Sequence, residues 1–205
     1  MKIEGIDALV VAAKRIRAVP DASARAAYRA VNTVTARVFT IAKREIASEI
    51  NLPQSYVAAQ TTITKATQAS AVGVIRMRMR DVRLARFAAT QLTKPAPRAR
   101  GDVRRGIAAG RKQAGVSVKV KRKGVRKLMP GAFMLPLRSG EVGGGNGLGV
   151  FIRTGKGPKA IRHLYGPSPD QLFLRWRAGA TPDIKRMLFE AYSSQLRYEL
   201  RGTRK

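Results

Sequence analysis

The sequence predicts an α+β fold, with a long helix packed against a small antiparallel sheet, a basic extended arm or hairpin, and a C-terminal helix. Three observations predict it. Apolar residues recur at helical spacing through about residues 21–50, apolar and polar residues alternate in several short segments between about 60 and 153, and a helix start signal occurs at Thr181. The strand segments are grouped and joined by short turns, which favours antiparallel pairing. A length of 205 residues suits one domain.

Two helices are expected before the first strand. Residues 3–17 place apolar side chains on one helical face. Pro20 and Asp21 then suit the first turn of a second helix, because that turn needs no proline N–H and a carboxylate favours the positive end of the helix dipole. This helix should run from about 21 to 50, since Pro53 disfavours further helix and could begin a short helix of its own.

A half-buried strand with arginines on its outer face is expected between 60 and 80, where apolar and basic residues alternate. The arginines are Arg76, Arg78 and Arg80. They would repeat every ~6.8 Å along one face, twice the rise of a strand, which suits contacts with phosphates. A solvated face, or a face that pairs with acidic groups of a neighbouring subunit, is an equally open alternative.

Residues 94–127 contain thirteen lysines and arginines but only one acid, Asp102, together with several prolines and glycines. Most of this segment has little apolar surface to bury, so a mobile basic arm or hairpin is expected, with a strand at 116–120. Its phosphate-contact candidates are Arg104, Arg105, Arg111, Lys112, Lys119, Lys121, Arg122, Lys123, Arg126 and Lys127. No aromatic residue is present on which bases could stack, so we expect salt-sensitive contacts to the backbone of double-stranded DNA, without sequence preference.

Two further strands, 132–137 and 148–153, are expected to form a hairpin with the glycine-rich turn 143–147 at its tip. The second of these strands carries large apolar groups on both faces. It should therefore be a central strand, with Phe151 buried against the long helix.

Glycines and prolines are frequent in residues 155–169, which predicts irregular structure with a tight turn at Tyr165, Gly166 and Pro167. Thr181 follows as an N-cap, with Pro182 at the first position of the C-terminal helix.

The net charge of +29 is the strongest compositional signal, since 41 lysines and arginines face only 12 acidic residues. A domain with this charge repels itself, so a polyanion, an acidic partner or extended arms must relieve the repulsion, and nucleic acid is the commonest such partner. No membrane partner is expected, because no amphipathic helix has a strongly basic face opposite Trp, Phe and Leu, and no apolar run approaches the ~20 residues of a transmembrane helix. The N-terminus lacks the apolar stretch of a secretory signal, so we expect synthesis and use in a cytoplasm, or in an assembly built there.

Catalytic groups are sparse. Cysteine is absent, which excludes disulfides and thiolate metal sites, and the acidic residues do not cluster as a metal-dependent nuclease requires. The single histidine, His163, is expected to be a partly buried, hydrogen-bonding residue rather than a catalytic base. We therefore expect no enzymatic activity, no metal and no cofactor.

Short motifs in a fixed order resemble a family of phage tail proteins. Residues 149–153 form a strand ending in Phe and Arg, and residues 161–168 end in a Gly-Pro-Ser loop. Residues 130–133 resemble the start of the preceding strand, and the opening segment 3–9 and the alanine-rich helix fit the same layout. On these residues the chain resembles bacteriophage minor tail protein Z, a tail completion protein.

This resemblance implies a single tail-completion-type domain over 1–205, with no catalytic role. It implies a virion protein of a long-tailed phage, assembled in the host cytoplasm, at the head-proximal end of the tail, where it helps to join tail to head around the DNA path. The partners would be a tail terminator or tube, the head connector and double-stranded DNA, and the chain would form a homo-oligomeric ring, a hexamer by analogy with tail tubes. Residues expected to shape the subunit or its interfaces are Phe133, Phe151, Tyr165, Gly166, Pro167 and Trp176.

Two other functions are compatible with the charge. One is a basic nucleic-acid-binding protein outside any virion, and the other is an enzyme that acts on DNA. Oligomerisation distinguishes a ring subunit from a nucleic-acid-binding protein outside the virion. A nuclease assay with and without divalent metal tests for an enzyme that acts on DNA.

Overall fold

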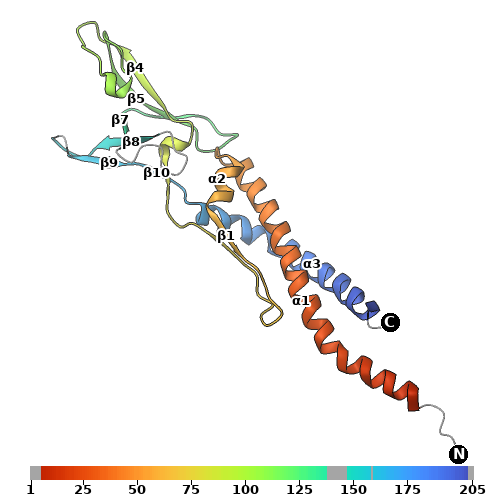
Figure 1. Ribbon diagram of the computed structural model, residues 1–205. Coiled ribbons are helices and arrows are strands. Elements are labelled where there is room, and N and C mark those ends of the chain that lie inside the picture. Colours follow the sequence, from red (N-terminus) through yellow and green to blue (C-terminus); the bar gives the residue numbers. More distant parts are fainter. Residues whose placement is uncertain (1–5, 138–146, 158, 203–205) are drawn as a thin grey trace, which may run out of the picture. The chain divides into compact units, whose positions relative to one another are not determined.

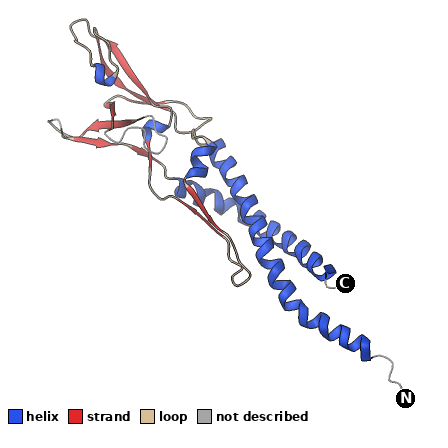
Figure 2. Cartoon of the chain, viewed as in Figure 1, coloured by secondary structure: helices blue, strands red, loops and turns tan. Residues whose placement is uncertain are grey.

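The computed structural model describes residues 6–137, 147–157 and 159–202 (Figure 1). The chain divides into two compact units. The first contains Met1–Ala42, Thr61–Met77 and Arg175–Lys205, and the second contains Lys43–Gln60 and Arg78–Leu174. Helices and small antiparallel sheets occur in the same chain (Figure 2), which confirms the α+β class.

One continuous helix, α1, spans Ile6–Glu49 with Pro20 inside it. The expected break at Pro20, with two separate helices, is therefore wrong. A proline removes one hydrogen bond of a helix and strains the preceding turn. Here alanines flank it on both sides, and alanine is the strongest helix former. The helix end is as expected, and a short helix, α2, follows Pro53 at Gln54–Ala59.

In the first unit, small side chains form the buried face of α1. Ala22, Ala26 and Ala30 are fully buried and lie four residues apart, which places them on one helical face. The second long helix, α3, spans Pro169–Gly202. Its Tyr192 hydroxyl and the Ser23 hydroxyl of α1 lie 2.9 Å apart. Alanine on the contact face therefore allows α1 and α3 to approach closely.

An ion-pair cluster joins the same two helices. The Nε of Arg25 donates to the carboxylate of Glu199 at 2.8 Å, and Arg29 donates to the other carboxylate oxygen. The hydrogen bond from Arg25 holds the pKa of Glu199 below its usual range, and the positive charge of Arg29 adds to this shift. Glu199 therefore stays ionised and neutralises part of the positive charge between the helices.

The C-terminal helix was expected to begin at Thr181, but α3 begins at Pro169 and contains Pro182 in its interior. The first-turn positions are occupied instead by Pro169 and Asp170, which are as suitable for a helix start as the pair predicted. Ser168 accepts a hydrogen bond from the N–H of Gln171, while the Gln171 side chain accepts one from the N–H of Ser168. This reciprocal pair is a capping box.

A two-stranded hairpin completes the first unit. Strand β1 (Thr61–Thr64) pairs antiparallel with β2 (Val74–Met77). The loop between them is fastened to α1, because the Asn32 amide donates to the carbonyl oxygen of Ala66 at 2.9 Å and accepts from its N–H at 2.8 Å. Two reciprocal hydrogen bonds to one backbone position fix the orientation of the hairpin on the helix.

The strand expected between 60 and 80, with Arg80 as its last outward arginine, is shorter than predicted. Strand β2 ends at Met77, and Met79 is 79% exposed rather than inward-facing. Gln60, the C-cap of α2, precedes β1, and its carbonyl oxygen accepts from the N–H of Arg78 at 2.9 Å. The partner strand therefore has no residue to pair with Arg80, so only Arg76 of the three arginines lies in the strand.

The described residues of the second unit form three small sheets. The first has the order β4 (Thr90–Pro95), β5 (Arg111–Val118), β6 (Lys127–Met129), and the second has the order β7 (Ala132–Pro136), β8 (Leu148–Arg153), β9 (Ile161–His163). The third pairs β3 (Val82–Arg83) with β10 (Tyr165–Gly166). Two short 3₁₀-helices, η1 (Leu84–Arg86) and η2 (Val103–Arg105), lie between strands. All neighbouring strands are antiparallel.

The prediction of strands at 132–137 and 148–153 is confirmed, and β8 is central, as expected. The glycine turn proposed between them lies largely outside the described residues. Two predictions for the following segment are wrong, because 155–169 contains β9 and β10, and Tyr165 and Gly166 form a strand instead of a tight turn. Gly166 is required by a close approach, since a Cβ there would lie 2.4 Å from Cε2 of the fully buried Phe87.

Candidate nucleic-acid interface

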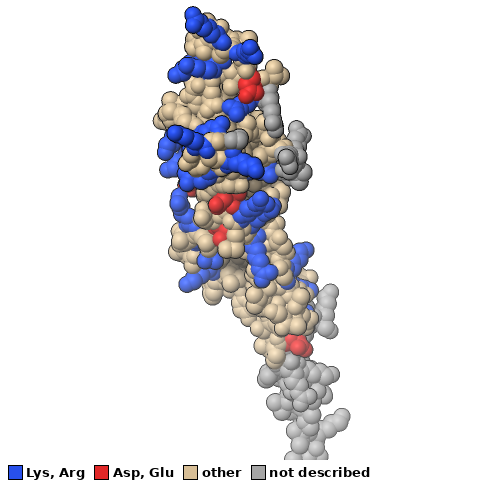
Figure 3. All heavy atoms as spheres, turned by 90° about the vertical axis from the view of Figure 1, so that its left-hand side faces the viewer, with Lys and Arg blue, Asp and Glu red and all other residues tan. Residues whose placement is uncertain are grey.

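Basic side chains cover the drawn face of the molecule far more densely than acidic ones (Figure 3). The 12 acidic residues can neutralise only a minority of the 41 basic ones. The structure separates the basic residues into those fixed by their own chain and those whose charged groups are directed to solvent. Only the second group is available to an external anion.

The long hairpin of β4 and β5 contains much of the basic segment (Figure 1). Lys94 pairs across it with Lys112, and Pro95 pairs with Arg111. The Arg111 guanidinium donates to the hydroxyl of Thr93 at 2.7 Å and to its carbonyl oxygen at 3.1 Å. This arginine is exposed, but its position along the hairpin is fixed.

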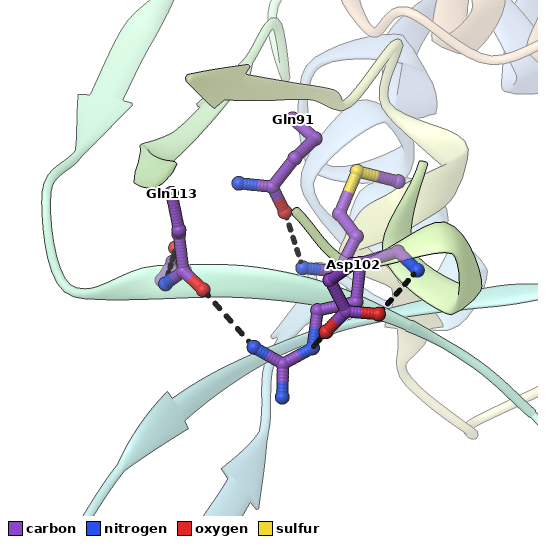
Figure 4. Close-up of polar contacts among 6 residues, drawn as sticks. Gln91, Asp102 and Gln113 are labelled. Atoms are coloured by element: carbon purple, nitrogen blue, oxygen red, sulfur yellow. Dashed lines mark hydrogen bonds and ion pairs between the residues drawn. The ribbon is translucent and has the colours of Figure 1, made fainter. Parts of the chain in front are cut away.

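A polar cluster supports the loop of this hairpin (Figure 4). Asp102 caps η2 by accepting from the N–H of Arg105 at 3.2 Å, and its second oxygen pairs with Nε of Arg105 at 3.2 Å. The same guanidinium donates to Oε1 of Gln113 at 3.4 Å and lies 5.0 Å from the ring centroid of Phe133. Arg105 is therefore part of the internal structure, contrary to its prediction as a phosphate contact.

Two glutamines connect the hairpin to the neighbouring strand β7. Gln113 donates to the carbonyl oxygen of Ala132 at 3.0 Å, and Gln91 accepts from the N–H of Met134 at 2.7 Å (Figure 4). Strand β7 is the edge strand of its sheet, so its backbone groups that face away from β8 have no partner strand. The two glutamines supply hydrogen bonds to two of these groups. The hairpin is thus anchored at its base to the sheet of β7, β8 and β9.

Arg122 also has an internal role. Its Nε donates to the carbonyl oxygen of Ala47 at 2.7 Å, its Nη2 donates to that of Leu52 at 3.2 Å, and its backbone N–H donates to that of Glu49 at 2.9 Å. The carbonyls at a helix end lack partners within the helix, and a cation there also favours the negative end of the dipole. Arg122 therefore caps the C-terminus of α1.

Arg126 forms a similar set of bonds beside β4 and β5. Its guanidinium donates to the carbonyl oxygen of Ala88 at 2.6 Å, and to the hydroxyls of Ser117 and Thr90 at 2.9 and 3.1 Å. The Arg126 guanidinium therefore donates its hydrogen bonds mainly to groups of its own chain. Arg78 is engaged less, through one bond of 3.2 Å to Oε1 of Gln60.

The remaining predicted contacts keep their charged groups in solvent. Within the described ranges, their ammonium or guanidinium groups form no hydrogen bond or ion pair. They are Arg76, Arg80, Lys112, Lys119, Lys121, Lys123 and Lys127. All are exposed except Lys119, which is half-buried. Arg104 lies in η2, but its side chain is outside the described part of the structure.

An aromatic row crosses the sheet of β7, β8 and β9 and continues to β10. Phe133 and Phe151 stack with ring centroids 6.1 Å apart, Phe151 and His163 with centroids 4.5 Å apart, and His163 lies 4.4 Å from Tyr165. Phe133 is buried, but Phe151 is only half-buried in this row, so its predicted burial against the long helix is wrong. It lies between aromatic neighbours of adjacent strands, because cross-strand pairing places them on the same face.

His163 is partly buried, as expected, but its Nε2 is buried without a hydrogen-bond partner, so the predicted hydrogen bonding is wrong for this atom. Burial lowers the pKa of His163, and the positive charge of Arg83 lowers it further. Gly149 allows the close packing, since a Cβ there would lie 2.9 Å from this nitrogen. The lowered pKa favours the neutral imidazole, and its stacking on Phe151 suits a structural role.

The other structural candidates have mixed environments. Tyr165 is 44% exposed, and Pro167 and Trp176 are half-buried. Among the residues that the structure describes, no three His, Cys, Asp or Glu side chains converge as metal ligands would. None of the described helices has the length and apolarity required to cross a membrane.

Sequence reasoning missed two arginines. Arg83 and Arg86 are half-buried at a hollow of about 180 Å³ that also contains Arg78 and Arg80. The density of arginines from 76 to 86 is the sequence signal for such a cluster. A strand pattern does not reveal it, because the alternation of apolar and basic residues ends at Arg80.

An apolar groove of about 410 Å³ lies within the first unit. Its lining includes Ala27 and Val31 of α1, and Leu188, Phe189 and Tyr192 of α3. Phe189 is 72% exposed. An exposed apolar groove of this kind is typical of a surface that docks another protein.

Comparison with known proteins identifies the family. The family model described as prophage minor tail protein Z (GPZ) matches residues 3–204. No curated protein and no solved structure matches the chain. Because the family match covers almost the whole sequence, the resemblance inferred from the motifs at 130–168 is confirmed. The chain belongs to the family of prophage minor tail protein Z, a structural family of phage tails.

Proposed function

We propose that this protein completes the head-proximal end of a long phage tail and helps to join tail to head around the path of the DNA. The family gives the coarser part of this function, a structural role in the virion tail in association with other tail proteins. A structural family also points away from enzymatic activity. The position at the head end is what the resemblance to tail completion proteins implies, while the DNA contact and the ring are inferred from the surface charge and the apolar groove.

The excess of unpaired positive charge carries the proposal. Lys112, Lys121, Lys123 and Lys127 direct charged groups into solvent from the second unit, and within the described residues no acid pairs with them. A surface of this kind is unfavourable in isolation, because like charges repel. A subunit facing duplex DNA obtains counter-charge from the phosphates, and the released counterions contribute to binding. Contacts by lysine are directed to the backbone and carry no base specificity.

Self-association into a ring is the second part of the proposal. A closed ring needs two unlike surfaces on each subunit, and by analogy with tail tubes we infer about six subunits. The apolar groove beside Phe189 provides one docking surface. Assembly would take place in the host cytoplasm, on the tail tube or its terminator and next to the head connector.

A cryo-EM reconstruction of the virion neck tests the proposal directly. Density for α1 and α3 should repeat around the tail axis at the head-proximal end, next to the DNA. A single copy per particle, or density only at the distal tip, would contradict it. A protein found on nucleic acid in infected cells but missing from purified virions would instead support the alternative of a nucleic-acid-binding protein outside the virion.

A further inference from the structure

The hollow near the end of α2 concentrates positive charge in a small volume. Arg78, Arg80, Arg83 and Arg86 line it together with a single carboxylate, Asp81. Four cations and one anion leave a surplus of three positive charges around about 180 Å³. Within the described residues Asp81 makes no ion pair, so even this carboxylate does not neutralise one of the arginines directly.

The backbone around the hollow is firmly fixed. Gln60 is held to Arg78 by the backbone bond of 2.9 Å and the side-chain bond of 3.2 Å. Arg83 belongs to β3, which pairs with β10. Arg86 ends η1, whose Leu84 and Ala85 are buried. Three of the four arginines, Arg78, Arg83 and Arg86, therefore project from hydrogen-bonded backbone, so an anion would find them already close together and ordering them would cost little entropy.

Some side chains that line the hollow are also held in place. The guanidinium of Arg86 lies 4.5 Å from the ring centroid of Tyr56, in a cation–π contact. Arg83 and Arg86 are half-buried, and partial removal from water strengthens their interaction with an anion. Because Oε1 of Gln60 is engaged by Arg78, its NH₂ group remains as a donor.

We propose that this hollow binds a phosphate group. A carboxylate has two oxygens in one plane and cannot satisfy donors that converge from several elements. A phosphate presents its oxygens tetrahedrally and accepts forked bonds from several guanidiniums at once. The volume leaves room for one small anion and ordered water. The DNA backbone as the source of the phosphate rests on the proposed function, whereas binding of the group itself does not.

Isothermal titration calorimetry with inorganic phosphate, against sodium chloride at equal ionic strength, tests the hollow without DNA. The variant Arg80→Gln/Arg83→Gln removes two of the four guanidiniums. The matched control, Arg98→Gln/Arg100→Gln, removes the same charge from the β4–β5 loop, outside the hollow. We expect saturable binding to the wild type and to the control, and binding roughly tenfold or more weaker to the hollow variant, which loses charge-assisted hydrogen bonds.

A second variant keeps the proposal testable if the double substitution unfolds the protein. Arg80→Lys preserves the charge but removes the planar fork of a guanidinium that makes no internal bond in the described structure, so phosphate binding should weaken while the thermal unfolding midpoint changes little. Absence of saturable phosphate binding to the folded wild type would overturn the proposal. Equal weakening in the hollow variant and the control would overturn it too, since it would indicate a diffuse charge effect.

Titration of the same variants with a short DNA duplex tests whether DNA supplies the bound phosphate. The titration is repeated over a range of salt concentrations. A larger loss of affinity in the hollow variant than in the control supports the DNA backbone as the source. If phosphate binds in the hollow but the two variants lose DNA affinity equally, the hollow is a phosphate site and DNA is excluded as its ligand. If the wild type binds no DNA at all, the proposed DNA contact is wrong. The titration with inorganic phosphate still shows whether the hollow binds a phosphate group.

Discussion

The guanidinium of Arg122 donates to the carbonyl oxygen of Ala47 at 2.7 Å, inside the last turn of α1. The sequence places Arg122 among the candidate phosphate contacts, in a segment expected to be a mobile arm or a hairpin. The bond changes that interpretation, because this arginine joins the region after β5 to a helix end 75 residues away in sequence.

Substitution of Arg122 should therefore destabilise the fold. We expect Arg122→Gln to lower the free energy of unfolding by about 1–2 kcal/mol, since the helix carbonyls lose charge-assisted bonds and only partly regain them from water. The neighbouring Lys121→Gln, whose ammonium group has no partner among the described residues, is the matched control and should change stability by less than about 0.5 kcal/mol. Urea unfolding of both variants measures the difference, and equal stabilities would show that the cap is unimportant.

Gly166→Ala should be strongly destabilising. The added Cβ would lie 2.4 Å from Cε2 of Phe87, a ring with no exposed surface. Overpacking of this kind typically costs about 1–3 kcal/mol. Gly131→Ala is the control, because nothing lies within 4 Å of its Cβ. Thermal unfolding that gave the same midpoint for both variants would contradict the close approach.

Stability should fall in acid through His163. Burial and the charge of Arg83 hold its pKa below the ordinary value of 6.5, so the folded state disfavours the protonated form. The contribution of neutral His163 to the free energy of unfolding is fully present above pH 6.5. It is lost as the pH falls through the pKa of His163 in the folded state. In His163→Gln the loss of stability between neutral and mildly acidic pH should be smaller than in the wild type, and DNA affinity should be unchanged. Identical pH dependence in the two proteins would exclude His163 as the titrating group.

DNA binding should depend on the lysines that have no partner in the described structure. Replacing Lys112, Lys121, Lys123 and Lys127 with glutamine should leave the fold intact, because their charged groups make no internal bond. For each phosphate that the variant no longer neutralises, the salt slope of duplex affinity should fall by about one unit.

A control variant should remove the same charge from exposed basic residues elsewhere. Its substituted residues are Lys65, Lys156, Lys159 and Arg201. Fluorescence anisotropy at several salt concentrations compares the two variants. If both show the same decrease in slope, the hairpin region has no special role in binding.

Self-association should depend on the apolar groove. Phe189→Asp places a charge on an exposed position of the groove, and desolvating that charge in an interface would be unfavourable. We expect light scattering after size exclusion to show smaller assemblies than the wild type. Tyr198→Asp, also on α3 and 69% exposed but outside the groove lining, should assemble normally. Assembly of Phe189→Asp to the wild-type size would place the subunit contact elsewhere.

Local sequence patterns were sufficient for some parts of the fold. Strand β8 was predicted at its observed bounds, because its apolar residues and the flanking glycine-rich segment define a strand without reference to distant residues. The end of α1 before Pro53 was also predicted, since the steric effect of proline acts on its immediate neighbour. The family was recognised from short motifs, and the match over 3–204 agrees.

Features that depend on distant partners could not be predicted in this way. Pro20 and Pro182 resemble helix starts, yet both lie inside helices, because packing of α1 against α3 outweighs the loss of one hydrogen bond at each. The roles of the arginines were undetermined for the same reason. Whether a guanidinium binds a carbonyl of its own chain, as in Arg122, or lines a hollow, as in Arg83, depends on which backbone groups the fold brings within reach, and no local pattern records that distance.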